Sequence, residues 1–284
     1  MTIQLMTDGG ADIPKRLQES MDIISVPLYL HFQDEQFKAG ETIDLETFHR
    51  KIKLSDELPR SAAPSPNDFY EAYKRIDSKV PIIMFSISRG ISTTYENAVL
   101  GKNMLLEEEP DRKIEVINTK TASCGIGLLL HEAKIKIGQG LTYNKLIDHL
   151  RERVEQTTTL FVLKTLENLV KGGRLDKMKG KIAKTLHIKV LMKASEEGTI
   201  EVADRVRGDK KSIRRFIEQI GEYTKDFEDK VISMTHCNAE ERASHVLEEI
   251  RKKYPFKDAY LTEMGPLIAT YAGEGGLVIS FFRD

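Results

Sequence analysis

The chain has 284 residues, of which 40% are hydrophobic and 31% are charged. This composition is typical of a globular protein, and the length allows one large domain or two of ordinary size. The 43 Lys and Arg residues nearly balance the 44 Asp and Glu residues, which leaves a formal net charge of −1. The balance excludes the overall basicity of nucleic-acid-binding proteins, so nucleic acid is not an expected partner and any anion site must be local.

Membrane insertion and metal binding have no support in the sequence. The longest apolar runs, such as residues 126–130, are far too short to cross a bilayer, so we expect no stable membrane insertion. The first residues, MTIQLMTDGG, lack the features of a signal peptide, and we therefore expect a cytoplasmic protein. Two cysteines and seven scattered histidines form no spaced ligand set, so neither a metal nor another cofactor is predicted.

Short apolar strands alternate with amphipathic helices in the first half of the chain, which is typical of βαβ units around a parallel sheet. The predicted strands lie at 3–6, within a β-rich stretch at 23–30, and at 36–38, 81–85 and 114–118. The predicted helices begin after Asp44, cover 68–76, follow the strand 81–85 to about residue 106, and cover 125–136 and 141–154. Asp12 is placed to cap a first helix after the strand 3–6. The proline-rich segment 58–67 is expected to be a loop whose Ser61 and Ser65 can turn inward.

The segment FSISRGISTTYENA changes from an apolar strand to hydroxyl-bearing residues and then to a helical pattern. Ser92, Thr93 and Thr94 are of the types that cap helices, and Glu96 follows Thr93 at the capping-box spacing. The free N–H groups of a helix N-terminus attract anions. Because the loop holds Arg89 but no acid, histidine or cysteine before the helix, it is suited to holding a carboxylate or phosphate rather than transforming one. An ordinary capped helix is the alternative.

Small polar loops follow three of the predicted strands, those at 3–6, 81–85 and 114–118. Ligands of open α/β sheets gather outside the carboxyl ends of the strands, so these loops are predicted to share one site. Gly125 and Gly127 lie early in the helix after the third loop, where each glycine costs about 1 kcal/mol relative to alanine. We therefore expect a ligand or another backbone to approach closely there.

The order of elements changes after residue 156, where two strands in a row, at 188–192 and 200–202, replace the strand-helix alternation. The predicted fold class is α/β with two domains. We expect an N-terminal parallel-sheet α/β domain at 1–156, which carries the polar loops, and a C-terminal α+β domain at 157–284.

Two basic groups stand out in the C-terminal half. A solvated surface is the ordinary explanation, and docking of an acidic partner or a phosphorylated ligand is the alternative. Arg174 follows two glycines and is the best candidate for such a contact, because arginine binds phosphate through two parallel hydrogen bonds. The two groups are Lys171, Arg174, Lys177, Lys179, Lys181 and Lys184, and Arg205, Arg207, Lys210 and Lys211.

Recognisable catalytic motifs are missing from the sequence. It contains no G-x-S-x-G elbow, no G-x-x-x-x-G-K-[ST] loop and no G-x-G-x-x-G after a strand. The run Glu107 to Glu109 is best explained as a solvated helix end. We therefore predict no catalytic residue and favour a binding protein over an enzyme.

Six segments of the sequence form a set whose order and spacing extend over nearly the whole chain. The segments are TDGGADIP, RSAAPS, SISRGISTTYENA, KGGRL, RVRGDKK and ATYAGEGGL. Together they make the chain resemble the DegV family of bacterial fatty-acid-binding proteins. The resemblance implies two α/β domains with a long-chain fatty acid buried between and within them, its carboxylate held by side-chain hydroxyls. It also implies that some members present the acid to a separate fatty acid kinase, which phosphorylates the carboxylate for phospholipid synthesis.

The resemblance also implies the residues that hold the carboxylate. The family's two head-group hydroxyls fall on Ser61 and Ser92, and Thr93 and Thr94 stand beside the second. The family's usual histidine before the final glycine-rich turn is Tyr271 here. A tyrosine hydroxyl can hydrogen-bond a carboxylate but brings no positive charge, so the head-group site is expected to be less cationic.

Arg174 and Arg207 match arginines of the family's glycine turn and later basic segment, where contact with the ligand phosphate or the kinase is implied. The C-terminal domain is expected to contribute to the acyl pocket, with residues 126–130, 186–191 and 277–282 as candidate wall segments. Further departures from the family pattern are Gly9, Ala62, Ala63 and Thr93.

Three hypotheses for function follow. The first is a fatty-acid carrier whose cargo is presented to a kinase. The second is an enzyme that acts on a small anionic substrate at the same loops. The third is a lipid sensor without a kinase partner, which the replacement of the family histidine by Tyr271 motivates.

Overall fold

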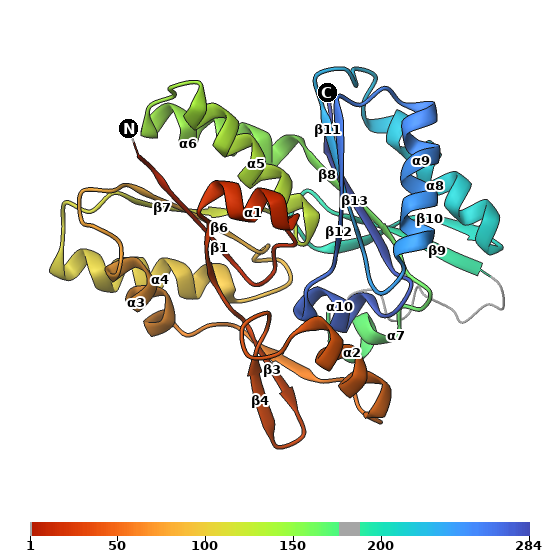
Figure 1. Ribbon diagram of the computed structural model, residues 1–284, viewed down its shortest axis with the longest axis horizontal. Coiled ribbons are helices and arrows are strands. Elements are labelled where there is room, and N and C mark those ends of the chain that lie inside the picture. Colours follow the sequence, from red (N-terminus) through yellow and green to blue (C-terminus); the bar gives the residue numbers. More distant parts are fainter. Residues whose placement is uncertain (1, 176–187) are drawn as a thin grey trace.

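Four parallel strands form the sheet of the first half of the chain (Figure 1). The computed structural model describes residues 2–175 and 188–284, except for the side chain of Arg16. The strand order is β2-β1-β6-β7, and every neighbouring pair runs parallel, as the alternating pattern predicts. The carboxyl ends of the strands therefore lie at one edge of the sheet. The strands are β1 (Gln4–Asp8), β2 (Ile24–Val26), β6 (Ile82–Ser86) and β7 (Ile114–Asn118).

Helices cover both faces of this sheet (Figure 1). On the face of α3 and α4, Phe69 and Leu105 pack against Met84 of β6. On the face of α5 and α6, Leu129 and Leu146 pack with Ile83 of the same strand. Because both faces are buried, β6 is apolar almost throughout and shows no polar alternation. The helices are α1 (Lys15–Met21), α3 (Pro66–Lys74), α4 (Thr94–Glu108), α5 (Cys124–Gly138) and α6 (Tyr143–Gln156).

A small antiparallel sheet of order β4-β3-β5 and the helix α2 project from this domain (Figure 1). The predicted hairpin at Asp34 is confirmed by the pairing of β3 with β4. The proline-rich segment holds a three-residue edge strand, in which Ser61 pairs with Leu30. Ser65 does not turn inward as expected, because its hydroxyl caps α3 by accepting from the Asp68 N–H at 3.2 Å. The elements are β3 (Tyr29–Phe32), β4 (Glu35–Lys38), β5 (Arg60–Ala62) and α2 (Leu45–Leu54).

Six strands form a second, mixed sheet of order β10-β9-β8-β13-β11-β12. The pair β11 and β12 is parallel, and the other neighbouring pairs are antiparallel. On one face, Phe216 of α8 and Val246 of α9 pack against Phe281. The elements are β8 (Thr157–Val162), β9 (Ile188–Ala194), β10 (Ile200–Arg207), β11 (Val231–His236), β12 (Asp258–Glu263), β13 (Leu277–Phe282), α8 (Asp209–Tyr223) and α9 (Glu240–Lys253).

The two sheets confirm the predicted α/β fold with two domains. α6 ends at Gln156 and β8 begins at Thr157, while the domain boundary at this point stays a prediction. α5 lies between the two sheets, since it contacts β6 as well as β11 and β13. Two short helices, α7 (Glu167–Lys171) and α10 (Pro266–Ala272), pack together beside the second sheet.

Two helix caps predicted from spacing are wrong. α1 begins after Pro14 without a side-chain capping bond, and Asp12 is buried with other partners. α4 begins after Thr93, whose side chain makes no capping bond, and Glu96 pairs instead with Arg89 at 3.3 Å. In both cases the acid has a partner outside the cap, and the local spacing cannot reveal such a partner.

Candidate functional site

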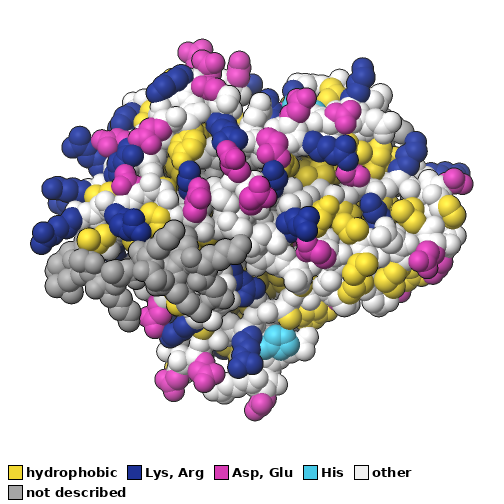
Figure 2. Space-filling view, turned by 180° about the vertical axis from the view of Figure 1, so that it is seen from behind, with side chains coloured by type: hydrophobic (Ala, Val, Ile, Leu, Met, Phe, Trp, Pro, Cys, Tyr) yellow, Lys and Arg dark blue, Asp and Glu magenta, His cyan; other side chains and the backbone are white. Residues whose placement is uncertain are grey.

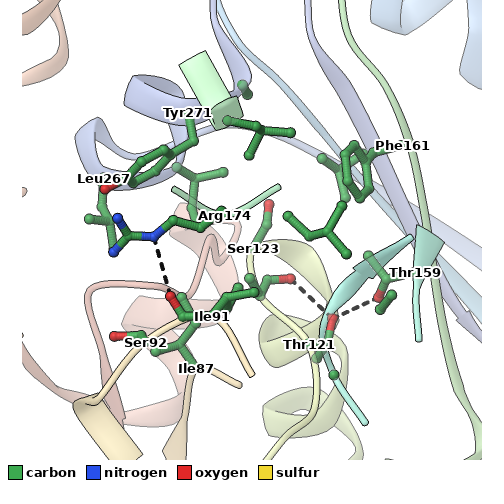
Figure 3. Close-up of a pocket in the computed structure, with 18 of the residues that line it drawn as sticks. Ile87, Ile91, Ser92, Thr121, Ser123, Thr159, Phe161, Arg174, Leu267 and Tyr271 are labelled. Atoms are coloured by element: carbon green, nitrogen blue, oxygen red, sulfur yellow. Dashed lines mark hydrogen bonds between the residues drawn. The ribbon is translucent and has the colours of Figure 1, made fainter. Parts of the chain in front are cut away.

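A cavity lies between the two sheets, at the edge where β6 and β7 end (Figure 3). The space between the wall residues amounts to about 850 Å³ when the part that is open to solvent is included. Two of the three polar loops predicted to share a site, those after β6 and β7, form its wall together with β8, β13, the β9–β10 hairpin, α7 and α10. The apolar wall residues are Leu28, Ile87, Ile91, Ala122, Phe161, Leu163, Leu169, Ala194, Ile200, Leu267, Ile268, Ala272 and Val278.

A polar cluster of Ser61, Ser92, Arg174 and Tyr271 lies at one end of this apolar cavity, and Figure 3 labels the last three of these residues. The hydroxyl oxygens of Ser61 and Tyr271 are 2.5 Å apart. The Arg174 guanidinium lies over the Tyr271 ring, with its central carbon 4.8 Å from the ring centroid. It donates to the carbonyl oxygens of Gly172 at 2.5 Å and of Ile91 at 3.3 Å. These contacts hold the cation beside the hydroxyls without a neutralising acid in the cluster.

Ser92 is the residue of the predicted anion cradle that reaches the cavity wall. Its hydroxyl lies 2.7 Å from the Thr94 hydroxyl and accepts from the Thr94 N–H at 3.3 Å, so it is fixed at the start of α4. Thr94 is fully buried behind it, and Thr93 is exposed. Ser92 therefore presents its own hydroxyl to the cavity, and the Thr94 hydroxyl contributes only through its contact with Ser92.

Hydroxyl groups also line the cavity away from the polar cluster. Thr121 and Thr159 lie 2.7 Å apart, oxygen to oxygen, and Ser123 stands nearby on the wall (Figure 3). The hydroxyl-rich loop after β7 was visible in the sequence, but Thr159 was not recognised. Its signal is weak, since Thr159 is one of three successive threonines that begin β8 and looks like an ordinary strand residue.

Two glycines at the start of α5 are explained by close contacts. A Cβ atom on Gly125 would lie 2.3 Å from Thr121 Oγ1, and one on Gly127 would lie 2.7 Å from the Asp12 carbonyl oxygen. The expected backbone approach is confirmed at Gly127. At Gly125 the neighbour is a side-chain hydroxyl of the cavity wall.

A buried aspartate, Asp8, ties the end of β1 to β6. It accepts from the N–H groups of Gly10 and Ile87 at 2.8 Å and from the Ser86 hydroxyl at 2.9 Å. Burial nevertheless raises the pKa of Asp8 to about 6, because three neutral donors do not replace the lost hydration of a carboxylate. Its role here is to hold the loop that precedes the cavity wall.

A second buried aspartate, Asp12, joins the two domains. One carboxylate oxygen accepts from the Ser123 hydroxyl at 2.5 Å, and the other accepts from the Gly265 N–H at 2.7 Å. Ser123 belongs to the cavity wall, and Gly265 immediately precedes α10, which carries Tyr271. Burial raises the pKa of Asp12 to about 7. Asp12 thus fixes parts of the cavity wall from both domains.

The predicted partner-binding arginines are separated in the structure. Arg174 lies in the polar cluster, whereas Arg207 is an exposed residue at the end of β10 and does not line the cavity.

Part of the first basic group lies outside the described residues, namely Lys177, Lys179, Lys181 and Lys184. The same is true of part of the candidate wall segment 186–191. On the face shown in Figure 2, basic and acidic side chains are interspersed over most of the surface.

No group of three or more His, Cys, Asp or Glu side chains in residues 2–175 and 188–284 is placed to hold a metal ion. In the same part of the chain, no helix has both the length and the apolar character needed to cross a membrane. The side chains that line the cavity carry hydroxyl groups, the Arg174 guanidinium, the Lys120 ammonium and apolar groups.

The fold and site define a class of two-domain α/β proteins with an apolar cavity between the domains and a polar cluster at one end of it. The chain belongs to the DegV family, described as "Uncharacterised protein, DegV family", whose profile matches residues 2–284. A DegV domain-containing protein of Streptococcus pneumoniae is 31% identical over 286 residues, with 100% of both chains covered.

Solved structures show the same fold along the whole chain. A DegV family protein from Ruminococcus gnavus, refined with vaccenic acid, is 27% identical, with 99% of each chain covered and a TM-score of 0.93. The Streptococcus pneumoniae Fatty Acid Kinase (Fak) B3 protein, loaded with linoleic acid, is 31% identical, with 100% of each chain covered and a TM-score of 0.89. The family resemblance and the two-domain fold expected from the sequence are confirmed.

Proposed function

We propose that this protein binds a long-chain fatty acid, with the acyl chain in the cavity and the carboxylate at the polar cluster. The observation that carries the proposal is an apolar cavity that ends at Ser61, Ser92, Arg174 and Tyr271. An amphipathic ligand with one anionic end matches this division of the wall. The solved relatives that contain vaccenic and linoleic acid support the same ligand class.

The polar cluster can offset the cost of burying a carboxylate. A buried carboxylate is stable only when several donors converge on it. Three hydroxyls and the Arg174 guanidinium can supply these donors, and the hydrogen bonds to the cation are the stronger ones. Each buried methylene contributes about 0.8 kcal/mol, so the acyl chain would supply most of the affinity.

We further propose that the bound acid is presented to a fatty acid kinase in the cytoplasm, where ATP is available. The support is the similarity to the Fak B3 protein and a surface hollow that leads to the polar cluster. Ser61, Arg174 and Tyr271 line this hollow, together with the exposed basic residues Arg60 and Lys171 and the exposed acidic residues Asp56 and Glu57. A partner could reach the carboxylate through it, with Arg174 as one proposed contact and Arg207, which lies outside the hollow, as the other. The protein itself would act as a binding protein and not as an enzyme.

The binding proposal is tested by mass spectrometry of an organic extract from the purified full chain. We expect a stoichiometric fatty acid in the parent protein and a clearly smaller amount in Ser61→Ala/Ser92→Ala. Ser78→Ala, an exposed serine that does not line the cavity, is the matched control and should retain the lipid. Absence of lipid in the parent, even after exposure to a mixture of free fatty acids, would contradict the proposal and favour a small anionic ligand at the same loops.

The kinase proposal needs a separate test with the lipid-loaded protein, a fatty acid kinase and ATP. Acyl phosphate can be trapped with hydroxylamine and measured as the hydroxamate. We expect the product to depend on this protein and to decrease in Arg174→Ala and Arg207→Ala, but not in the control Arg214→Ala, whose side chain is 82% exposed on α8. A loaded protein that no such kinase accepts would support the lipid-sensor hypothesis instead.

A further inference from the structure

The cavity has a second polar region opposite the polar cluster. In Figure 3, Tyr271 and Arg174 lie on one side of the cavity, and Thr121 and Thr159 lie on the other. Every second residue from Thr159 through Phe161 to Leu163 faces the cavity. This part of the wall is therefore polar at Thr159 and apolar at Phe161 and Leu163. Four residues of extended chain span about 13 Å, which corresponds to on the order of ten carbon–carbon bonds of an acyl chain.

The other polar residues at that end already have strong partners. The Ser123 hydroxyl is bonded to Asp12 at 2.5 Å and to Thr235 at 2.8 Å. The Lys120 ammonium pairs with Glu155 at 2.7 Å. Asp12 thus takes the Ser123 proton and Glu155 holds the Lys120 ammonium, so we take Thr121 and Thr159 as the polar region.

The hydrogen bonds of the threonine pair leave one proton with a weak partner. The Thr159 hydroxyl lies 2.7 Å from Thr121 and 2.8 Å from Ser280, and the Cys124 thiol lies 3.4 Å from the Ser280 hydroxyl and 3.7 Å from the Val278 carbonyl oxygen. When the thiol donates to Ser280, the nearer of its two acceptors, the three hydroxyl protons point in sequence from Ser280 toward Thr121. The Thr121 proton then has only the Ala122 carbonyl oxygen, at 3.3 Å, which is long for an O–H donor.

We propose that the preferred ligand is a fatty acid with a hydroxyl group in the far half of its acyl chain, and that Thr121 recognises this group. The inference rests on the proposed function, because it concerns the same cavity. Thr121 turns its hydroxyl proton away from the Ala122 carbonyl oxygen and donates it to the ligand hydroxyl. The ligand hydroxyl in turn donates its own proton to that carbonyl oxygen. Donation along the chain of hydroxyls from Ser280 strengthens the bond that Thr121 makes.

The test compares 12-hydroxyoctadecanoic acid with octadecanoic acid on the delipidated full chain. Native mass spectrometry of an equimolar mixture gives the ratio of the two complexes directly. We expect the parent protein to favour the hydroxy acid about fivefold, the size of one net hydrogen bond. In Thr121→Val the preference should reverse, because the ligand hydroxyl would be buried without its donor. Thr121→Ser should restore it.

Two controls separate the inference from the proposed function. Thr142→Val, an exposed threonine outside the cavity wall, should keep the parent's ratio. 2-Hydroxyoctadecanoic acid carries its hydroxyl beside the carboxylate and should be insensitive to Thr121→Val. Equal binding of both acids in the parent and in Thr121→Val would overturn the inference alone. Failure of both acids to bind would overturn the proposed function.

Discussion

The hydroxyl oxygens of Ser61 and Tyr271 lie 2.5 Å apart, although 210 residues separate them in the chain. Ser61 comes from the edge strand β5 of the N-terminal half, and Tyr271 comes from α10 of the C-terminal half. The polar cluster therefore exists only when both halves are folded and in contact. Each hydroxyl has one proton, and their shared bond uses one of the two, so a carboxylate that arrives can receive donors from both after a small rearrangement.

Ser61→Ala and Tyr271→Phe should each weaken fatty-acid binding about fivefold, because each removes one hydroxyl donor from the carboxylate. The double variant should lose less than the product of the two single effects, since the residues share one hydrogen bond. Displacement of a fluorescent fatty acid from the delipidated protein measures all three affinities. Ser78→Ala serves as the control. Fully multiplicative losses would show that the pair does not act as a unit.

The sequence predicted much of the fold because apolar periodicity is a local property. The strand at 114–118 and the helix at 141–154 match β7 and α6 closely, since each buries a regular set of side chains. The proline-rich loop suggested that Ser61 can turn inward, but the head-group roles of Ser61 and Tyr271 came from the family resemblance. No periodic pattern could have paired two residues so distant in the chain.

The misses concern side chains whose partners lie in another element. Asp12 has the spacing of a helix cap, yet its carboxylate accepts from Ser123 and from Gly265, which follows it by 253 residues. Thr159 looks like an ordinary strand residue until Thr121 is placed beside it by α5 and the second sheet. Both are long-range contacts, and local propensity carries no information about them.

Gly125→Ala should destabilise the protein by about 1–3 kcal/mol, as expected for an overpacked site. The new Cβ would lie 2.3 Å from Thr121 Oγ1, 2.8 Å from Thr121 Cγ2 and 3.0 Å from Thr159 Oγ1, so these hydrogen-bonded side chains would have to shift. Gly138→Ala, in the same helix, is the matched control because no atom lies within 4 Å of its added Cβ. It should stabilise by about 0.5 kcal/mol through helix propensity and chain entropy. Urea unfolding of both variants checks the opposite signs.

Asp12 should make stability depend on pH. Its folded-state pKa is raised from 3.8 to about 7, so the folded protein holds the proton more tightly than the unfolded chain does. The free energy of unfolding should therefore fall as the pH rises from about 4 to 7 and level off above that range. Asp8, raised to about 6, contributes in the same direction over a narrower interval.

Asp12→Asn isolates this contribution, because the amide can accept from Gly265 and donate to Ser123 without titrating. Between pH 5 and pH 8, the parent should lose about 2 kcal/mol more unfolding free energy than the variant does. Urea unfolding at the two pH values measures the difference. Parallel losses in the two proteins would show that the Asp12 proton is not linked to folding.

Tyr271→His should make fatty-acid binding pH-dependent. The tyrosine hydroxyl offers a hydrogen bond but no positive charge, so the parent's affinity should change little between pH 6 and pH 8. A histidine in its place would be protonated near and below its usual pKa of about 6.5 and would then pair with the ligand carboxylate. We expect the variant to bind several-fold more tightly at pH 6 than at pH 8. Tyr271→Phe, which has neither hydroxyl nor charge, should bind weakly at both. A flat profile in Tyr271→His would place the carboxylate away from Tyr271 and out of the polar cluster.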